Sequence, residues 1–399
     1  MSIPSPAMPG RLYLDNAATS FPKPPEVMQA MQDYAARLGA SAGRGGYAEA
    51  LETGELLTAC RTAINKLING QDARQVVFTL NCTDALNLAL RGLVDPFDPG
   101  HVVCSALDHN SVLRPIHAMA EQWGLAFTIV QADPATSLLD PAAVREAIRD
   151  DTRYVVLTHA SNVTGALQPL REIATVCREA GVPIVVDAAQ SLGHLPIDVQ
   201  ADGIDLLAAP GHKGLLGPLG TGLLYVRPGL ESRVRPLREG GTGTRSGEPE
   251  QPGDMPDRYE SGSHNAIGLA GLLAAVRWVS RQGVADLAAH ERRLSERFVA
   301  SLENSGVRRF GPVSPGDHVG VHSVRIDGLD PHELSGMLES GYGILTRSGI
   351  HCAPLLHRLL GTIDGGGTTR ISFGPFVTEE DVDRVTRALA ELAESVAAA

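Results

Sequence analysis

Two apolar runs in the middle of the chain each end in a side chain that can carry chemistry. The run Ile184 to Val186 stops at Asp187, and the run Ile204 to Ala208 stops just before His212 and Lys213. Ligands of open α/β sheets bind beyond the carboxyl ends of the strands, so we expect the carboxylate and the amine to face one crevice. A lysine that forms a Schiff base and an acid that keeps a pyridine nitrogen protonated are the groups that pyridoxal 5'-phosphate (PLP) chemistry requires.

Lys213 lies in a turn rich in glycine, with Gly211, Gly214, Gly217 and Gly220 close to it in sequence. The alternative is an ordinary solvated lysine, since most lysines lie on the surface. Glycines let the backbone approach a ligand closely, and a lysine in a poorly solvated pocket has a lowered pKa and becomes a nucleophile. The glycine spacing matches neither a Walker loop nor a dinucleotide-binding GxGxxG motif.

Three more polar segments follow predicted strands. Cys82 and Thr83 open a helix, where free N–H groups can bind a phosphate or the segment can simply cap the helix. His109 follows the next strand, where an imidazole could stack on an aromatic cofactor or be structural. Asn162 follows a third strand and could equally be a turn residue. The crevice shared with Lys213 favours phosphate binding by the first segment.

Cys352 lies on a predicted loop between Gly349 and Pro354. Most unpaired cysteines are small buried hydrophobic residues, which is the alternative here. Arg347 and His351 are close in sequence, and positive neighbours favour the nucleophilic thiolate. We therefore treat Cys352 as a candidate nucleophile.

Arg370 is flanked by apolar residues in a strand-like segment. A buried arginine needs a carboxylate partner, which could belong to the protein or to a substrate. His351, Cys352 and His357 lack a recognisable metal-ligand spacing, so we predict no metal site.

The composition of the 399-residue chain limits the kinds of partner. It is 43% hydrophobic and 20% charged, an ordinary globular balance, and its net charge of −12 argues against nucleic acid or an anionic membrane as the main partner. Five scattered cysteines and an N-terminus without an export signal predict a reducing cytoplasm. No uncharged apolar run approaches the ~20 residues that span a bilayer.

Apolar strands alternate with amphipathic helices between residues 75 and 226. This pattern predicts an α/β fold with a mostly parallel sheet covered on both faces. The expected strands are Val76–Leu80, Val102–Ala106, Ala126–Val130, Tyr154–Thr158, Ile184–Val186, Ile204–Ala208 and Leu223–Val226. The helices expected in this region are Thr83–Arg91, Ser111–Trp123, Pro141–Ile148 and Leu170–Ala180. Two further helices, Glu26–Leu38 and Leu51–Ile68, are expected before it.

The chain changes character after this region. Residues 240–264 are rich in Gly, Pro and Ser, as in a functional loop. A long helix starts at Ile267, and strands at Ser323–Ile326, Gly343–Leu345 and Thr369–Phe373 mix with helices, which predicts a smaller α+β domain. We expect an N-terminal arm over residues 1–20 that packs with the small domain, a large PLP-binding domain over 21–265, and a linking helix with the small domain over 266–399.

Together these segments resemble the cysteine desulfurase family, class V of the fold-type I PLP enzymes. The resemblance covers nearly the whole chain and includes several specific motifs in the family's order. Since no long insertion surrounds Cys352, the chain looks most similar to the SUF-type desulfurase and selenocysteine lyase branch. The motifs are LDNAATSFPKP, ASAGRGGYAEALE, FTLNCTDALNLAL, DHNSVLRP, HASNVTGALQP, VDAAQSLGHLPIDVQ, GHKGLLGPLGTG, YESGSHN, RSGIHCAP and TTRISFGPF.

The resemblance implies how PLP would be held. Lys213 would carry it covalently, Asp187 would pair with the pyridine nitrogen, Gln190 would contact the ring oxygen and His109 would stack on the ring. The phosphate would be surrounded by Cys82, Thr83 and His212, and by Ser263 from the second subunit of a homodimer, where the family usually has threonine. Pro210 departs from the SUF-type pattern, which has a phosphate-binding serine at this position.

The resemblance also implies the reaction. Arg370 with Asn162 would hold the substrate carboxylate, Arg347 would lie close by, and Cys352 matches the persulfide-forming cysteine. We therefore expect L-cysteine to be converted to L-alanine, with the sulfur left on Cys352 for an acceptor protein and for sulfur metabolism such as iron–sulfur cluster assembly. The alternatives are a selenocysteine lyase or C–S lyase of the same fold, a class V aminotransferase, or a non-catalytic sulfur-relay scaffold.

Overall fold

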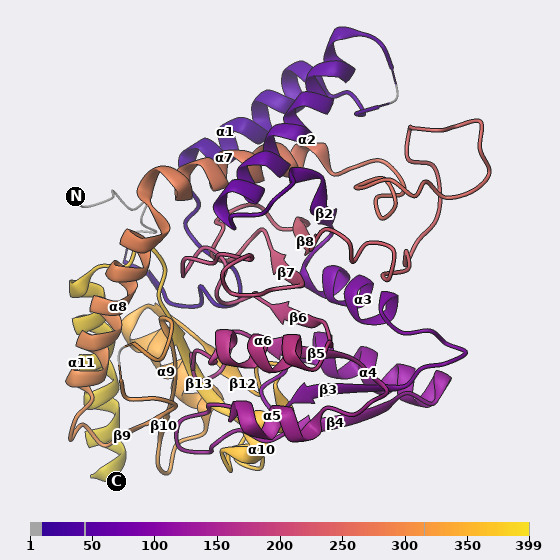
Figure 1. Ribbon diagram of the computed structural model, residues 1–399. Coiled ribbons are helices and arrows are strands. Elements are labelled where there is room, and N and C mark those ends of the chain that lie inside the picture. Colours follow the sequence, from indigo (N-terminus) through magenta and orange to yellow (C-terminus); the bar gives the residue numbers. More distant parts are fainter. Residues whose placement is uncertain (1–9, 44, 315, 399) are drawn as a thin grey trace.

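The computed structural model describes residues 10–43, 45–314 and 316–398, and within them a seven-stranded sheet forms the centre of the larger part of the molecule (Figure 1). Within this sheet only β8 runs antiparallel to its neighbours. The predicted α/β class with a mostly parallel seven-stranded sheet is confirmed. In spatial order the strands are β2 (Val76–Thr79), β8 (Gly222–Val226), β7 (Leu206–Pro210), β6 (Ile184–Asp187), β5 (Thr152–Thr158), β3 (His101–Ser105) and β4 (Ala126–Val130).

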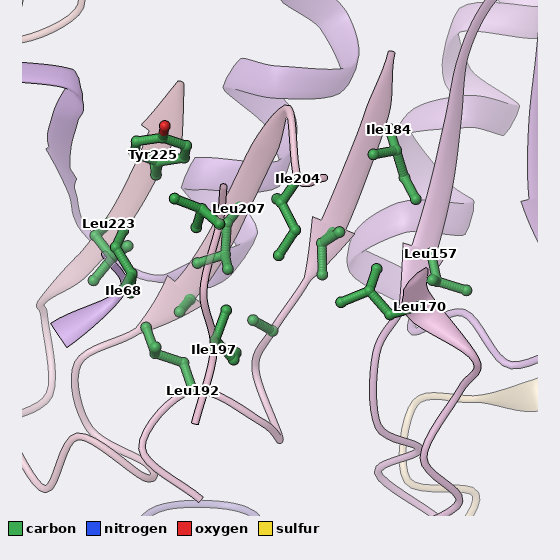
Figure 2. Packing of buried hydrophobic residues seen from close by; sticks show 14 of the residues in the cluster. Ile68, Leu157, Leu170, Ile184, Leu192, Ile197, Ile204, Leu207, Leu223 and Tyr225 are labelled. Atoms are coloured by element: carbon green, nitrogen blue, oxygen red, sulfur yellow. The ribbon is translucent and has the colours of Figure 1, made fainter. Parts of the chain in front are cut away.

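Helices cover both faces of this sheet. Ile184 and Val186 of β6 enter one apolar layer, whereas Val185 enters the other, because successive side chains of a strand point to opposite faces. Figure 2 shows part of the first layer, in which Leu207 of β7 lies between Leu223 of β8 and Ile184 of β6. The first layer packs against α2 (Ala48–Leu67), α5 (Pro141–Ala147), α6 (Leu170–Glu179) and α7 (Ala266–Gln282), and the second against α3 (Cys82–Gly92) and α4 (Asn110–Trp123).

Strand β7 begins two residues later than predicted, so the prediction of Ile204–Ala208 is wrong at both ends. The N–H of Ile204 bonds to the carbonyl of Val199 in a turn, at 3.0 Å. The carboxylate of Asp205 accepts the N–H of Ile184 and pairs with Arg227, which ends the turn and lets the ladder start at Leu206. At its other end the strand extends to Pro210, which pairs with Gly222 of β8.

The first predicted helix, Glu26–Leu38, is also only partly right. The α-helix α1 (Pro25–Asp33) ends at Asp33 and continues as one wider turn, the π-helix η1 (Tyr34–Leu38). Gly39 ends this turn in the left-handed conformation, with φ 57°, and its N–H bonds to the carbonyl of Tyr34. A short 3₁₀ turn, η2 (Ala73–Gln75), leads into β2.

The C-terminal part contains a four-stranded antiparallel sheet with its own apolar core. Figure 1 shows α8 and α11 side by side on its outer face. None of the helices that the structure describes combines the length and apolar character that a membrane crossing requires. The sheet has the order β12 (Arg347–Gly349), β13 (Thr368–Ser372), β10 (Val321–Ile326) and β9 (Val307–Phe310), and its helices are α8 (Val284–Ser301), α9 (Pro331–Tyr342), α10 (Pro354–Leu359) and α11 (Glu379–Ala397).

The described part of the predicted N-terminal arm lies against this C-terminal part. Strand β1 (Leu12–Tyr13) pairs in parallel with β11 (Ile344–Leu345), and the N–H of Ala17 bonds to Oγ of Ser372 at 2.9 Å. Residues 1–9 of the arm lie outside the described residues. The domain boundaries themselves stay predictions.

A buried ion pair fixes the end of the glycine-rich loop 240–264. Arg61 of α2 donates to both carboxylate oxygens of Glu260, and its guanidinium lies 4.1 Å from the centroid of the Phe78 ring. Nε2 of His264 lies 2.6 Å from the same carboxylate. The side chains of Arg61 and Glu260 are only 9% and 3% exposed, so each charge depends on the other.

Replacing Arg61 by methionine should destabilise the protein strongly. The substitution keeps an apolar side chain but leaves the Glu260 carboxylate buried without its main counter-charge, a loss of about 3–5 kcal/mol in the free energy of unfolding. Urea unfolding of the cofactor-free protein measures this. Arg74→Met, which removes an exposed pair with Asp72, is the control and should have no measurable effect. Equal stability of the two variants would contradict this view of the loop.

Candidate active site

A cavity of about 110 Å³ lies at the carboxyl ends of β5, β6 and β7. It is the position at which open α/β sheets bind ligands. The structure brings many of the sequence-predicted residues together there. The cavity is lined by, among others, Cys82, Thr83, His109, Asn162, Asp187, Gln190, Pro210, His212 and Lys213.

Asp187 is the last residue of β6 and is buried. Its Oδ1 accepts the N–H of Ala189 at 2.9 Å and lies 3.5 Å from Sγ of Cys82. Burial, followed by this carboxylate, raises the pKa of the Cys82 thiol well above its usual range. Cys82 is therefore a neutral lining residue at neutral pH, and its thiol points to the Asp187 carboxylate.

Lys213 occupies the turn after β7 and lines the same cavity as this carboxylate. Burial lowers its pKa, and the positive charges of Arg370 and Arg347 act in the same direction. The carbonyl oxygen of the preceding residue, His212, accepts from Nζ of Lys23 at 2.9 Å and from the N–H of Ser20 at 3.0 Å. These bonds hold the turn in place, and no local pattern in the sequence predicts them.

His109 caps α4, and its ring orientation is fixed by that role. Its Nδ1 accepts the N–H of Ser111 at 3.0 Å, so the neutral ring carries its proton on Nε2. Burial lowers the pKa of His109, which favours this neutral form. Oγ of Ser111 also lies 2.8 Å from Oγ1 of Thr83, which links the starts of α3 and α4.

Asp108, next to His109, anchors the same turn to the sheet. Its carboxylate accepts the N–H of Ser105 at 2.6 Å and the hydroxyl of Thr158 at 2.7 Å. Burial raises its pKa to about 6. Asp108 therefore ties strand β3 to strand β5.

The Cys352 loop reaches this cavity from the small sheet. The N–H of Asn110 bonds to the carbonyl of Cys352 at 2.8 Å, and Nδ2 of Asn162 bonds to the carbonyl of His351 at 2.6 Å. Both His351 and Cys352 have left-handed φ values, 50° and 58°, which are unusual for residues other than glycine. Cys352 is partly exposed.

The expected positive charge on His351 is absent. Burial, followed by the charge of Arg370, lowers the pKa of His351 well below its usual value. Its ring is therefore neutral at neutral pH, and Nε2 bonds to Thr368. The prediction that His351 supports a thiolate on Cys352 by its charge is wrong, because the sequence could not show that the ring is buried.

Arg370 of β13 is 1% exposed and finds a carboxylate within the protein. Its Nη2 lies 2.7 Å from Oδ1 of Asp15, and its Nη1 donates to the carbonyl of Asn162 at 3.1 Å. Its Nε is buried without a hydrogen-bond partner among the residues described. Arg347 of β12 stands opposite Arg370 in the ladder.

Ser263 is not brought to the Lys213 cavity. It is exposed and lines a separate cavity of about 260 Å³ with the end of the 240–264 loop. Its Oγ lies 3.5 Å from that of Ser41. Within one chain, Ser263 therefore takes no part in the cluster around Lys213.

The donor set of the Lys213 cavity fits PLP. The first turn of α3 leaves N–H groups for an anion, and a buried carboxylate and an amine lie on the same walls. Nδ1 of His212 and Oδ1 of Asn162 are buried and lack a hydrogen-bond partner in residues 10–43, 45–314 and 316–398. The described part of the chain contains no group of three or more His, Cys, Asp or Glu side chains arranged to hold a metal ion.

Comparison with known proteins agrees with this geometry. The aminotransferase class-V family matches residues 12–385, and the chain belongs to this family. The chain is 34% identical to a probable cysteine desulfurase of Methanothermobacter thermautotrophicus, over 97% of this chain and 96% of the relative. It is also 32% identical to a cysteine desulfurase of Haloferax volcanii, over 95% and 88%.

Solved structures of cysteine desulfurases also have the same fold as this chain. The apo structure of the cysteine desulfurase from Thermococcus onnurineus NA1 superimposes with a TM-score of 0.92 at 31% identity and covers 99% of both chains. The cysteine desulfurase CsdA from Escherichia coli gives 0.86 at 29% identity, over 98% of this chain and 97% of that one. The predicted resemblance to class V and to its cysteine desulfurases is confirmed.

Thiol labelling should single out Cys352 in the native protein. It is partly exposed, whereas the other thiols are buried and burial raises the pKa of each, so native iodoacetamide labelling should be at least about tenfold faster at Cys352. Peptide mass spectrometry reports each site, and urea-unfolded protein, in which all five thiols should react, is the control. Equally fast labelling of Cys82 in the cavity would contradict the burial described here. The four protected thiols are Cys60, Cys82, Cys104 and Cys177.

Proposed function

We propose that this protein is a PLP-dependent cysteine desulfurase that converts L-cysteine to L-alanine and leaves the sulfur as a persulfide on Cys352. One observation carries the proposal. The cavity that holds Lys213, Asp187 and His109 is joined to the Cys352 loop by a hydrogen bond from Asn110, the residue after His109. The loop that carries Cys352 is thus held beside the cavity that contains the amine and the acid, which come from distant parts of the chain.

The residues that would hold PLP divide by chemistry. Lys213 would attach it, Asp187 would pair with the pyridine nitrogen and the neutral His109 ring would stack on it. Nε2 of Gln190 donates to the carbonyl of Ala17 at 2.9 Å and keeps a second N–H for the ring oxygen. The phosphate would lie at the first turn of α3 against Cys82, Thr83 and His212.

Pro210 makes one difference at the phosphate end. It lines the cavity but has neither a hydroxyl nor an N–H group, so the serine contact of the SUF-type pattern has no counterpart at this position. We propose that His212 and the partner subunit carry more of the phosphate binding in this chain.

When bound, PLP supplies a ring that takes up the electrons released as bonds at the substrate Cα break. Because the pKa of Lys213 is lowered, its amine can hold the Cα proton and return it. The buried Asp187 carboxylate would stabilise the positive charge on the protonated pyridine nitrogen of bound PLP. Arg370 and Asn162, with Arg347 close by, would orient the substrate carboxylate from the side of β13, and Nε of Arg370 has no partner in the described structure.

Sulfur transfer needs no external oxidant or reductant. The thiolate of Cys352 attacks the substrate sulfur, so that an S–S bond forms as the Cβ–S bond breaks. The electron pair of the broken bond stays with Cβ, which is protonated to the methyl group of L-alanine. The sulfur of Cys352 and the transferred sulfur are thereby oxidised, and Cβ is reduced.

We also propose that the enzyme works as a cytoplasmic homodimer that passes its sulfur to an acceptor protein for uses such as iron–sulfur cluster assembly. The exposed position of Ser263, away from the Lys213 cavity of its own chain, supports a site shared between subunits. The cysteines at positions 60, 82, 104, 177 and 352 are free, which supports a reducing compartment.

Cys352→Ser should leave PLP binding intact but stop sulfur transfer. A hydroxyl is a much weaker nucleophile than a thiolate at neutral pH, so L-alanine formation from L-cysteine should fall by about a hundredfold or more. No persulfide should be trapped by alkylation and mass spectrometry. Cys177→Ala, in a core helix, is the control and should keep the activity. Wild-type turnover by Cys352→Ser would instead indicate a general C–S lyase.

If the site is shared between subunits, a hybrid dimer of two inactive variants should regain activity. Lys213→Ala lacks the amine, and Ser263→Glu would place a carboxylate where the partner's phosphate binds. A hybrid dimer contains one site with Lys213 and the partner's native Ser263, so it should recover about half of the wild-type activity. Co-expression with two affinity tags isolates the hybrid. An inactive hybrid would show that each chain builds its own site.

A further inference from the structure

A buried histidine and a glutamate lie behind the Lys213 turn, outside the cavity described above. Nδ1 of His194 lies 2.8 Å from Oε2 of Glu291, which belongs to α8. The other carboxylate oxygen accepts the N–H of Gly320 at 2.6 Å. Both side chains are 12% exposed. The pair thus connects the α8 helix with the loop that follows β6.

The His194 ring packs directly on the residue after Lys213. A Cβ built on Gly214 would lie 2.6 Å from Cδ2 and 2.9 Å from Nε2 of His194, closer than real Cβ atoms approach. Gly193, with φ +90°, comes equally close, because its Cβ would lie 2.3 Å from the carbonyl oxygen of Gly214. Both positions need glycine, which keeps the imidazole against the turn.

A second, smaller cavity lies between this pair and Lys213. It has a volume of about 20 Å³, and its polar lining residues are Asn16, Ser20, His194, Lys213 and Glu291. Among the described residues, Lys213 alone lines both this cavity and the larger one. Nε2 of His194 is buried and has no hydrogen-bond partner within the described structure. A polar cavity of this size can hold one water molecule, which would satisfy that nitrogen.

We propose that His194 and Glu291 are positioning residues that hold one water against Lys213 and set how readily its amine takes up and releases a proton. The proposal rests on the proposed function, in which Lys213 moves the Cα proton. Nε2–H of His194 donates to the water, and the water donates to the neutral amine. If Lys213 takes a proton from this side, the water supplies it and the Nε2–H of His194 reprotonates the water. The Nδ1–H of His194 meanwhile keeps donating to the Glu291 carboxylate.

The charges around the pair support proton transfer from His194 toward Lys213. Burial opposes a charged His194, but the Glu291 carboxylate raises its pKa above the usual value, and Lys213 lowers it. A charged imidazole across one water should in turn disfavour the ammonium form of Lys213. The other charged or titratable groups that interact with Lys213 include Cys82, Asp187, Arg347 and Arg370, together with His109 and the adjacent His212.

The test measures the titration of Lys213 in the protein without PLP or substrate. The chain has three lysines, Lys23, Lys66 and Lys213, so amine acylation followed by peptide mass spectrometry reports each one as a function of pH. Lys66 is exposed and serves as the internal reference. His194→Gln should raise the titration midpoint of Lys213 by about half a pH unit or more, roughly a threefold change in its proton affinity, and leave Lys66 unchanged.

His101→Gln is the matched control, because His101 is a buried, hydroxyl-bonded histidine at the start of β3. It should not move the Lys213 midpoint. A purely structural tie between α8 and the loop would also leave that midpoint unchanged in a folded His194→Gln protein. That result would overturn the proposal without touching the desulfurase proposal, because no turnover is measured.

A second measurement does not depend on a variant of His194. Coupled titrations are reciprocal, so the imidazole signal of His194, followed by NMR with labelled histidine, should titrate at higher pH in cofactor-free Lys213→Ala than in wild type. Glu291→Gln should move the same signal to lower pH. An unchanged His194 midpoint in Lys213→Ala would overturn the proposal even if His194→Gln does not fold.

Discussion

The architecture of the site depends on keeping the Lys213 amine out of water beside the buried Asp187 carboxylate. A protonated lysine loses much of its hydration there, which lowers the pKa of Lys213. A larger fraction of the amine is therefore neutral and can act as nucleophile and base. The parallel strands β6 and β7 make this possible, because both end at the same edge of the sheet. Glycines at 193 and 214 then let the neighbouring loop close on the turn without a side chain between them.

The proposed reaction also requires that the Cys352 loop, which follows strand β12 of the small sheet, lies near the carboxyl ends of β6 and β7. Hydrogen bonds from Asn110 and Asn162 hold the backbone of the Cys352 loop, so this loop lies where the large domain and the small sheet meet. Arg370 extends the same junction, since it bonds to the Asn162 carbonyl and to Asp15 of the N-terminal segment. The loop of the proposed nucleophile is therefore held by backbone contacts, and the neighbouring His351 ring is neutral.

Local patterns predicted the fold class and the placement of Asp187 and Lys213, because strand ends and glycine-rich turns are visible in the sequence. Contacts between distant segments were not predictable in this way. The partner of Arg370 is Asp15, 355 positions away, and the partner of His194 is Glu291, 97 positions away. The start of β7 was missed because the Asp205 carboxylate, not the apolar pattern, sets where the ladder begins.

The central claim is that Lys213 is the amine that holds PLP in this cavity. The most direct measurement is to incubate the protein with PLP, reduce it with borohydride, digest it and locate the phosphopyridoxyl mass among the three lysines of the chain. The account predicts one label per chain, on Lys213, with Lys23 and Lys66 unmodified. A label on either of those two lysines with Lys213 free, or no stable label at all, would contradict it.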